Sequence, residues 1–256
     1  MNILSLKDLI DWQPPNIKPI ISSGILHPGT KMFLFGNYKS WKSMLSIHTG
    51  FCIALGRLWL GHATTQRRVL IVQLEIPQAL YRNRIIDYCK GNNCYPDNIY
   101  FASEPYLKLD RDYGVARLDT VLSTLKPEVL ILDPLYKLLS GDISNSYAVE
   151  VYQSNMDRLL HKHNLTLINV SHTRQQLITP AGLLIDMGAD EIMGSSFWPN
   201  WIDSAIRVRK DAEDQQSISL TLCYEAMRNA LDILHPIKVL VDRRRLTWRV
   251  LPEDDR

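Results

Sequence analysis

The feature that most constrains the fold of this sequence is a loop that begins with a glycine and connects an apolar strand to a helix. The apolar run Met32–Phe35 predicts a buried strand, and Gly36 follows it. Lys42-Ser43 then begins an amphipathic segment, for which we predict a helix to Leu55. This order nearly matches the P-loop pattern Gly-x-x-x-x-Gly-Lys-Ser/Thr, whose backbone N–H groups hold polyphosphate oxygens. In that pattern the lysine reaches the β- and γ-phosphates, and the serine hydroxyl ligates Mg²⁺.

One position of the loop departs from the pattern, because Trp41 stands where the second glycine belongs. Glycine lets the backbone approach a phosphate closely, so a tryptophan must adopt the same backbone conformation or change the loop. Lys39 partly compensates by adding a cation near the phosphates. We therefore expect nucleotide binding, with hydrolysis that could be slow. The expected nucleotide contacts are Gly36, Asn37, Tyr38, Lys39, Ser40, Trp41, Lys42, Ser43 and Met44.

The rest of the chain alternates strand and helix patterns. Its 256 residues, 46% of them hydrophobic, suffice for one substantial core. Prolines at 14, 15, 19 and 28 predict an extended arm over residues 1–28, and we assign residues 29–256 to one domain. Strands are expected at 68–74, 98–102, 129–132 and 165–170, and helices at 78–90, 114–125 and 147–164. Continuous apolar strands alternating with helices predict an α/β fold with a mostly parallel central sheet flanked by helices.

After residue 200 the apolar residues alternate with polar ones. Period-2 segments at 204–208, 217–222, 238–241 and 246–250 predict strands, and the last two form an expected hairpin that turns at 242–245. We therefore predict an antiparallel extension of the parallel sheet at its C-terminal end.

Polar residues suited to nucleotide hydrolysis follow the other predicted strands. Ligands of open α/β sheets bind at the carboxyl ends of the strands, so these residues should meet the loop. Asp133 is a candidate Walker B carboxylate for Mg²⁺, although an Asp before a proline could instead cap a turn. Glu75 is a candidate general base for the attacking water, or else a helix-capping or solvated glutamate. His172 could donate a hydrogen bond to the γ-phosphate, or be a structural histidine.

Together these segments resemble the RecA-like ATPases of the RepA and DnaB helicase branch, also called the KaiC-like group. They are also similar to the AAA-family ATPases that plasmids and phages carry. The resemblance runs from about Ile21 to the C-terminus and rests on 36–43, 72–77, 130–135, 171–174, 193–204 and 224–229. It implies a RecA-like P-loop ATPase that uses ATP and Mg²⁺. It places the family's catalytic glutamate on Glu75, the Walker B aspartate on Asp133 and the polar sensor on His172.

The same resemblance implies an arginine that acts in trans at a subunit interface. Arg228 is its best match, and Arg207, Arg209 and Lys210 on a neighbouring predicted strand are alternatives; all four could instead be solvated strand-edge residues. An arginine of this kind acts only in an assembly. We therefore expect a homo-oligomer, as a hexameric ring or a filament.

The amino-acid composition places only weak limits on the binding partners, and the sequence shows no targeting segment. A net charge of +2 neither requires nor excludes nucleic acid. Four scattered cysteines predict reduced thiols, and the sequence shows no signal peptide and no apolar run of bilayer length. We expect a cytoplasmic protein with no membrane part.

Two functions remain open from the sequence. The first is a motor on single-stranded DNA, as a replicative helicase or recombination ATPase of a mobile element; the second is a regulatory or assembly switch acting on protein partners. In RecA-like rings the channel loops would be 140–146 and 175–191, and neither interleaves aromatic with basic residues as strand stacking requires. The densest basic cluster is the turn Arg243-Arg244-Arg245, which could contact phosphate or be solvated.

Overall fold

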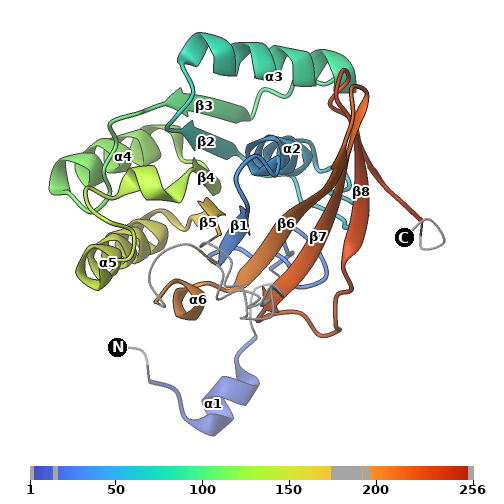
Figure 1. Cartoon of the computed structure of the whole chain (residues 1–256). Coiled ribbons are helices and arrows are strands. Elements are labelled where there is room, and N and C mark those ends of the chain that lie inside the picture. Colours follow the sequence, from blue (N-terminus) through green and yellow to red (C-terminus); the bar gives the residue numbers. More distant parts are fainter. Residues whose placement is uncertain (1–2, 14–16, 174–191, 193–196, 253–256) are drawn as a thin grey trace, which may run out of the picture.

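A single mixed sheet organises the computed structural model, which describes residues 3–13, 17–173, 192 and 197–252. The sheet has the strand order β3-β2-β4-β5-β1-β6-β7-β8-β9 (Figure 1). Its strands are β1 (Lys31–Gly36), β2 (Val69–Gln73), β3 (Ile99–Ser103), β4 (Val129–Asp133), β5 (Thr166–His172), β6 (Ser204–Glu213), β7 (Ser217–Met227), β8 (Ile237–Asp242) and β9 (Trp248–Val250). Every pairing from β3 to β6 is parallel, and the pairings from β6 to β9 are antiparallel. The predicted fold class is confirmed.

Helices cover both faces of the parallel part of this sheet. The helices that the structure describes are α1 (Leu6–Asp11), which lies apart from the sheet (Figure 1), α2 (Lys42–Leu55), α3 (Gln78–Asn92), α4 (Asp112–Leu125), α5 (Ser146–His163) and α6 (Phe197–Trp201), with a 3₁₀ turn η1 at Leu135–Leu138. Successive residues of β1 face opposite sides. Met32 and Leu34 belong to the core on the α2 and α3 side, while Phe33 and Phe35 belong to the core on the α4 and α5 side. Both faces of β1 are therefore buried, which explains its uninterrupted apolar run.

Helix α2 packs closely against the sheet. A Cβ added at Gly50 would lie 2.8 Å from Cδ1 of Ile71 on β2, so with a larger residue either this side chain or the helix would have to shift. Because α2 begins directly after the loop that follows β1, this close packing fixes the loop over the carboxyl ends of the strands.

The N-terminal segment departs in part from the expected extended arm. Residues Leu6–Asp11 form α1, which Ser5 and Asp8 close with a reciprocal capping box, and α1 lies apart from the sheet in Figure 1. Further along, Ile20, Ile21, Ile25 and Leu26 are fully buried in the core on the α2 side. The second half of this segment is thus packed as part of the core; the division of the chain at residue 28 stays a prediction.

The C-terminal strands β6 and β7 are longer than the sequence predicted. β6 starts beside the first residues of β1 and continues to Glu213, well past the end of β1. The outer half of β6 is exposed and polar, so it lacks the alternation by which we recognised strands. The predicted hairpin of β8 and β9 is confirmed, and Asp242 closes its turn by accepting from the N–H groups of Arg244 and Arg245 at 2.8 Å. Among the helices that the structure describes, none is long and apolar enough to cross a membrane.

Candidate functional site

The loop after β1 is held in an unusual backbone conformation. Gly36 passes so close to β6 that an added Cβ would lie 2.3 Å from the Val208 carbonyl oxygen. Lys39 and Trp41 both have left-handed backbones, with φ of 58° and 65°. Trp41 is the N-cap of α2, and its half-buried ring packs against the core on the α2 side. The tryptophan therefore adopts the left-handed geometry that glycine would take freely, at a backbone cost of about 1–2 kcal/mol.

Lys42 projects into the centre of this loop. Its side chain is 5% exposed, and Nζ donates to the Asn37 carbonyl oxygen at 2.6 Å and to Ser40 Oγ at 3.3 Å. Burial lowers the pKa of Lys42 to about 8, although the charges of Asp133 and Glu75 act in the opposite direction. The ammonium is thus held among oxygen atoms, where phosphate oxygens would be bound.

Asp133, the last residue of β4, faces helix α2. It is 9% exposed, and its carboxylate accepts hydrogen bonds from Ser43 and from Ser46 Oγ, the latter at 3.3 Å. Burial raises the pKa of Asp133 to about 6, and the charge of Glu75 adds to the rise, while Ser43, Lys42 and Ser46 oppose it. Its described side-chain bonds go to helix α2 rather than to the following turn, so the geometry does not match that of a turn-capping aspartate.

Ser43 and Asp133 fit a magnesium ion bound with phosphates. Their hydroxyl and carboxylate are hard oxygen donors in direct contact, and Mg²⁺ usually takes one or two carboxylates while phosphates and waters complete its shell. No cluster of three or more His, Cys, Asp or Glu side chains in the described residues could hold a metal alone. Any Mg²⁺ here would therefore depend on the nucleotide for part of its coordination.

Glu75 lies just beyond β2 on a turn that two other residues fix. The Tyr136 hydroxyl donates a hydrogen bond to Glu75 Oε1; burial and Glu75 itself raise the pKa of Tyr136, so this hydroxyl keeps its proton. Gln73 is 3% exposed, and its Oε1 accepts from the N–H groups of Glu75 at 3.2 Å and Ile76 at 2.7 Å. The Gln73 amide Nε2 donates to the Ile76 carbonyl at 2.5 Å and to Ser103 Oγ at 2.7 Å. All of the amide's polar atoms thus hold the Glu75 turn.

Gln73 and Tyr136 are site residues that the sequence reasoning missed. A polar residue ending the otherwise apolar run Val69–Gln73 is a usable signal, since a buried amide must be satisfied. Tyr136 gave no comparable signal, because its contact with Glu75 spans 61 positions of the chain.

His172, the last residue of β5, lies between two tyrosine rings. Its ring centroid is 5.8 Å from that of Tyr136 and 6.1 Å from that of Tyr38. Burial, together with the nearby charge of Lys42, lowers the pKa of His172, so the imidazole is neutral at pH 7. The next residue, Thr173, donates its N–H to the Gly36 carbonyl at 3.0 Å and its hydroxyl to Asn37 Oδ1 at 2.5 Å. The end of β5 is thereby tied to the phosphate-binding loop.

These strand ends surround one cavity of about 420 Å³. The residues that line it are Tyr38, Lys39, Trp41, Lys42, Ser43, Glu75, Ile76, Arg84, Asp133, Pro134, Val170, His172, Lys210 and Glu213. Each strand-end residue predicted from the sequence is among them. Of the expected nucleotide contacts, Gly36, Asn37, Ser40 and Met44 do not line the cavity.

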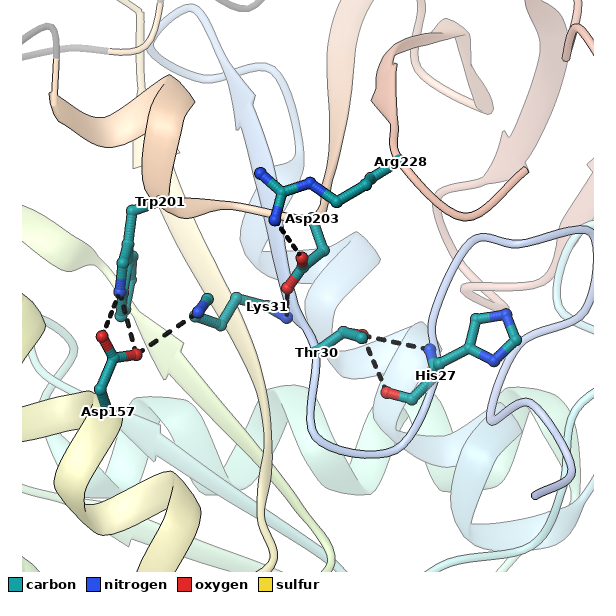
Figure 2. A network of polar contacts seen from close by, with 7 residues as sticks. All are labelled: His27, Thr30, Lys31, Asp157, Trp201, Asp203 and Arg228. Carbon is teal, nitrogen blue, oxygen red and sulfur yellow. Dashed lines mark hydrogen bonds and ion pairs between the residues drawn. The ribbon is translucent and has the colours of Figure 1, made fainter. Parts of the chain in front are cut away.

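Arg228 lies at the other end of the sheet. Its Nη1 donates to Asp203 Oδ1 at 2.9 Å, while Asp203 Oδ2 accepts from the N–H of Lys31 at the same distance (Figure 2). Lys31 is the first residue of β1, and Gly36, after which the loop begins, is the last. The strand between them is about 17 Å long. Arg228 is therefore remote from the cavity of its own subunit.

The alternatives to Arg228 are placed differently from one another. Arg207 forms a half-buried ion pair with Glu225 at 2.6 Å, and Arg209 pairs with Asp211 at 3.2 Å. Lys210 lines the cavity, where its Nζ lies 2.6 Å from Glu213 Oε2. Arg228 thus lies beside the start of β6, whereas the other three candidates lie further along that strand.

A strand-loop-helix phosphate site, with carboxylates at two strand ends of a mostly parallel sheet, defines a RecA-like P-loop ATPase. A family model described as an AAA domain matches residues 2–176, so the chain belongs to this AAA domain family. Its structure is similar to a KaiC-like protein from the hyperthermophilic archaeon Pyrococcus horikoshii OT3, with a TM-score of 0.59. The two are 12% identical over 91% of this chain and 94% of the other, so the likeness shows the fold alone. None of the curated proteins matches the sequence.

Proposed function

We propose that this ATPase binds ATP with Mg²⁺ in the cavity at the strand ends, hydrolyses it, and works as an oligomeric motor on single-stranded DNA. The observation that supports hydrolysis is that Lys42, at the start of α2, lines one cavity together with Asp133, Glu75 and His172 from three separate strand ends. RepA-like helicases and recombination ATPases of mobile elements are the class of motor that the resemblance favours.

Each residue has a distinct task in the proposed reaction. The loop N–H groups and the Lys42 ammonium bind the β- and γ-phosphates. Ser43 and Asp133 would hold Mg²⁺, which would supply positive charge to neutralise the phosphate oxygens. Glu75 orients a water toward the γ-phosphorus and accepts its proton as the new P–O bond forms and the bond to the β-phosphate oxygen breaks. The neutral His172 donates a hydrogen bond to the γ-phosphate.

Two features support self-association of the chain: the position of Arg228 and the exposed apolar face of α1. Arg228 lies too far from its own phosphate-binding loop to act there, so any role in catalysis must be on a neighbouring subunit. Near the N-terminus, Leu6, Leu9 and Ile10 of α1 are more than half exposed. These three positions fall on one face of the helix, and such an apolar face is typical of a protein contact. We propose a ring or filament, with a hexamer as the family precedent.

A switch that acts on protein partners is the second candidate. The described loop at residues 140–146 contains Asp142 and no basic residue, which does not favour a contact with DNA phosphates. The other expected channel loop, 175–191, lies outside the described residues. The exposed turn Arg243–Arg245 supports DNA binding, although Arg243 also pairs with Glu213 at 3.2 Å.

ATPase assays with and without single-stranded DNA separate the two candidates. A motor is expected to hydrolyse ATP several-fold faster with DNA, and the stimulation should weaken steeply as salt rises. Replacing Arg244 and Arg245 together by Gln should reduce the affinity for DNA and the salt dependence of that affinity. The rate of ATP hydrolysis without DNA should not change. Hydrolysis that no nucleic acid stimulates at any salt concentration would exclude the motor and favour the switch.

A further inference from the structure

One cation that lines the cavity has no hydrogen-bond or ion-pair partner among the residues that the structure describes. Lys42 is bonded to the loop, Lys210 is paired with Glu213, and Lys39 lies over the ring of Tyr38, 5.4 Å from its centroid. Arg84 of α3 lines the same cavity, is exposed, and makes no hydrogen bond or ion pair within the described residues. An exposed guanidinium facing a phosphate-binding cavity is available to an anionic ligand.

The position of α3 brings Arg84 to the Glu75 side of the cavity. The helix begins at Gln78, three residues after Glu75, and helical side chains lean back toward the N-terminus of their helix. Arg84 therefore leans from the second turn toward the turn that carries Glu75. Its neighbour Tyr81, one turn earlier and 5% exposed, is affected by the charges of both Arg84 and Asp133. The guanidinium and the Asp133 carboxylate thus both act on the hydroxyl group of Tyr81.

The loop and Lys42 determine which part of a bound nucleotide lies nearest the Glu75 side of the cavity. The loop and Lys42 hold the β- and γ-phosphates, and the water that Glu75 orients attacks the γ-phosphorus. The ligand atoms closest to Glu75 are therefore the γ-phosphate oxygens, whereas the ribose and base lie on the far side of the loop. An arginine beside Glu75 meets those oxygens, and its planar fork suits a phosphate better than a lysine ammonium does.

We propose that Arg84 contacts the γ-phosphate of ATP bound in its own subunit and stabilises the charge that develops there during hydrolysis. This inference rests on the proposed ATPase function. It adds to that function a positively charged residue that the same subunit supplies. It differs from the expected action of Arg228, because a contact in cis requires no neighbouring subunit.

Selective loss of affinity for the triphosphate tests the contact. The variants are Arg84→Gln, Arg84→Lys and the matched control Arg82→Gln, since Arg82 is exposed on the same helix but lines a different groove. The Kd values of ADP and of the non-hydrolysable analogue AMPPNP are measured with Mg²⁺ by calorimetry, and folding is checked by thermal unfolding. Arg84→Gln should weaken AMPPNP binding by about tenfold to hundredfold and leave ADP binding within about twofold.

The control and the lysine variant complete the test. Arg82→Gln should leave both Kd values unchanged, and Arg84→Lys should show a smaller loss that is still confined to AMPPNP. Equal losses for both nucleotides, or no loss in either Arg84 variant, would overturn the inference while leaving the ATPase assignment intact. If the unaltered protein binds neither nucleotide, the proposed function itself fails and this inference fails with it.

Discussion

The buried amide of Gln73 offers a sharp test of how the Glu75 turn is held. Replacing it by methionine keeps the length of the side chain and removes both polar atoms. Four hydrogen bonds are then lost, to Glu75 N, Ile76 N, Ile76 O and Ser103 Oγ. Glu75 is exposed, so its N–H can bond to water instead, whereas the groups of Ile76 and Ser103 are only partly accessible.

The expected magnitude follows from these bonds. A net contribution of about 1 kcal/mol for each of the three less accessible bonds predicts a loss of about 2–4 kcal/mol in the free energy of unfolding. The turn that carries Glu75 is also released, and a displacement of about 1 Å in a catalytic group lowers kcat by roughly 100-fold. The affinity for ATP should change little, because Lys42 and its loop contact no atom of Gln73 through a described hydrogen bond.

Urea denaturation, steady-state ATPase kinetics and nucleotide binding measure these quantities on the same variant. Loss of stability with an unchanged kcat would show that Gln73 supports the fold alone and does not position Glu75. A rise in the Kd of ATP as large as the fall in kcat would show that the whole site had been disturbed. Either result would refute the argument.

Three further predictions concern the other parts of the site. Glu75→Gln should bind ATP as the unaltered protein does and hydrolyse it at least about 100-fold more slowly; unchanged turnover would remove Glu75 from the mechanism. Trp41→Gly should keep nucleotide affinity within about threefold, since glycine adopts φ of 65° freely, whereas Trp41→Val should weaken it about tenfold because a β-branched residue is strained there. Equal affinities of the two variants would show that the left-handed conformation is not needed. Burial disfavours the ionised carboxylate of folded Asp133 and raises its pKa from the ordinary 3.8 to about 6. This group therefore makes the protein about 3 kcal/mol more stable below pH 4 than above pH 6, and that difference is lost as the pH rises through 6. Denaturation in EDTA from pH 4 to 7 should show that loss as a change in the difference in stability between the unaltered protein and Asp133→Asn; a difference that stays constant with pH would contradict it.

Much of the fold could be predicted from the sequence because its signals are local. The strand and helix around Gly36 and Lys42 follow from an apolar run and a short motif. The strand-end positions of Glu75, Asp133 and His172 follow from the rule that parallel strands present their carboxyl ends at one edge. Each of these inferences needs only neighbouring residues, and Lys42, Glu75, Asp133 and His172 all line the cavity.

The contacts that the sequence could not show depend on tertiary packing. Ile20 and Ile21 lie in a segment rich in proline and glycine, a pattern typical of a loop, yet they are buried against the α2 side of the core. Tyr136 reaches Glu75 from a segment 61 positions further along the chain, so no spacing in the sequence connects the two residues. Trp41 broke the glycine pattern, and only the backbone angles show that it keeps the left-handed conformation of that position.

The central claim is that the loop from Gly36 to Ser43 binds the phosphates of ATP for hydrolysis. The most direct measurement is the rate of phosphate release by Lys42→Ala compared with the unaltered protein, at saturating ATP and Mg²⁺. Because Lys42 is the buried cation at the centre of the loop, turnover by the variant should fall to background. Hydrolysis by Lys42→Ala at the rate of the unaltered protein would contradict the assignment of this site.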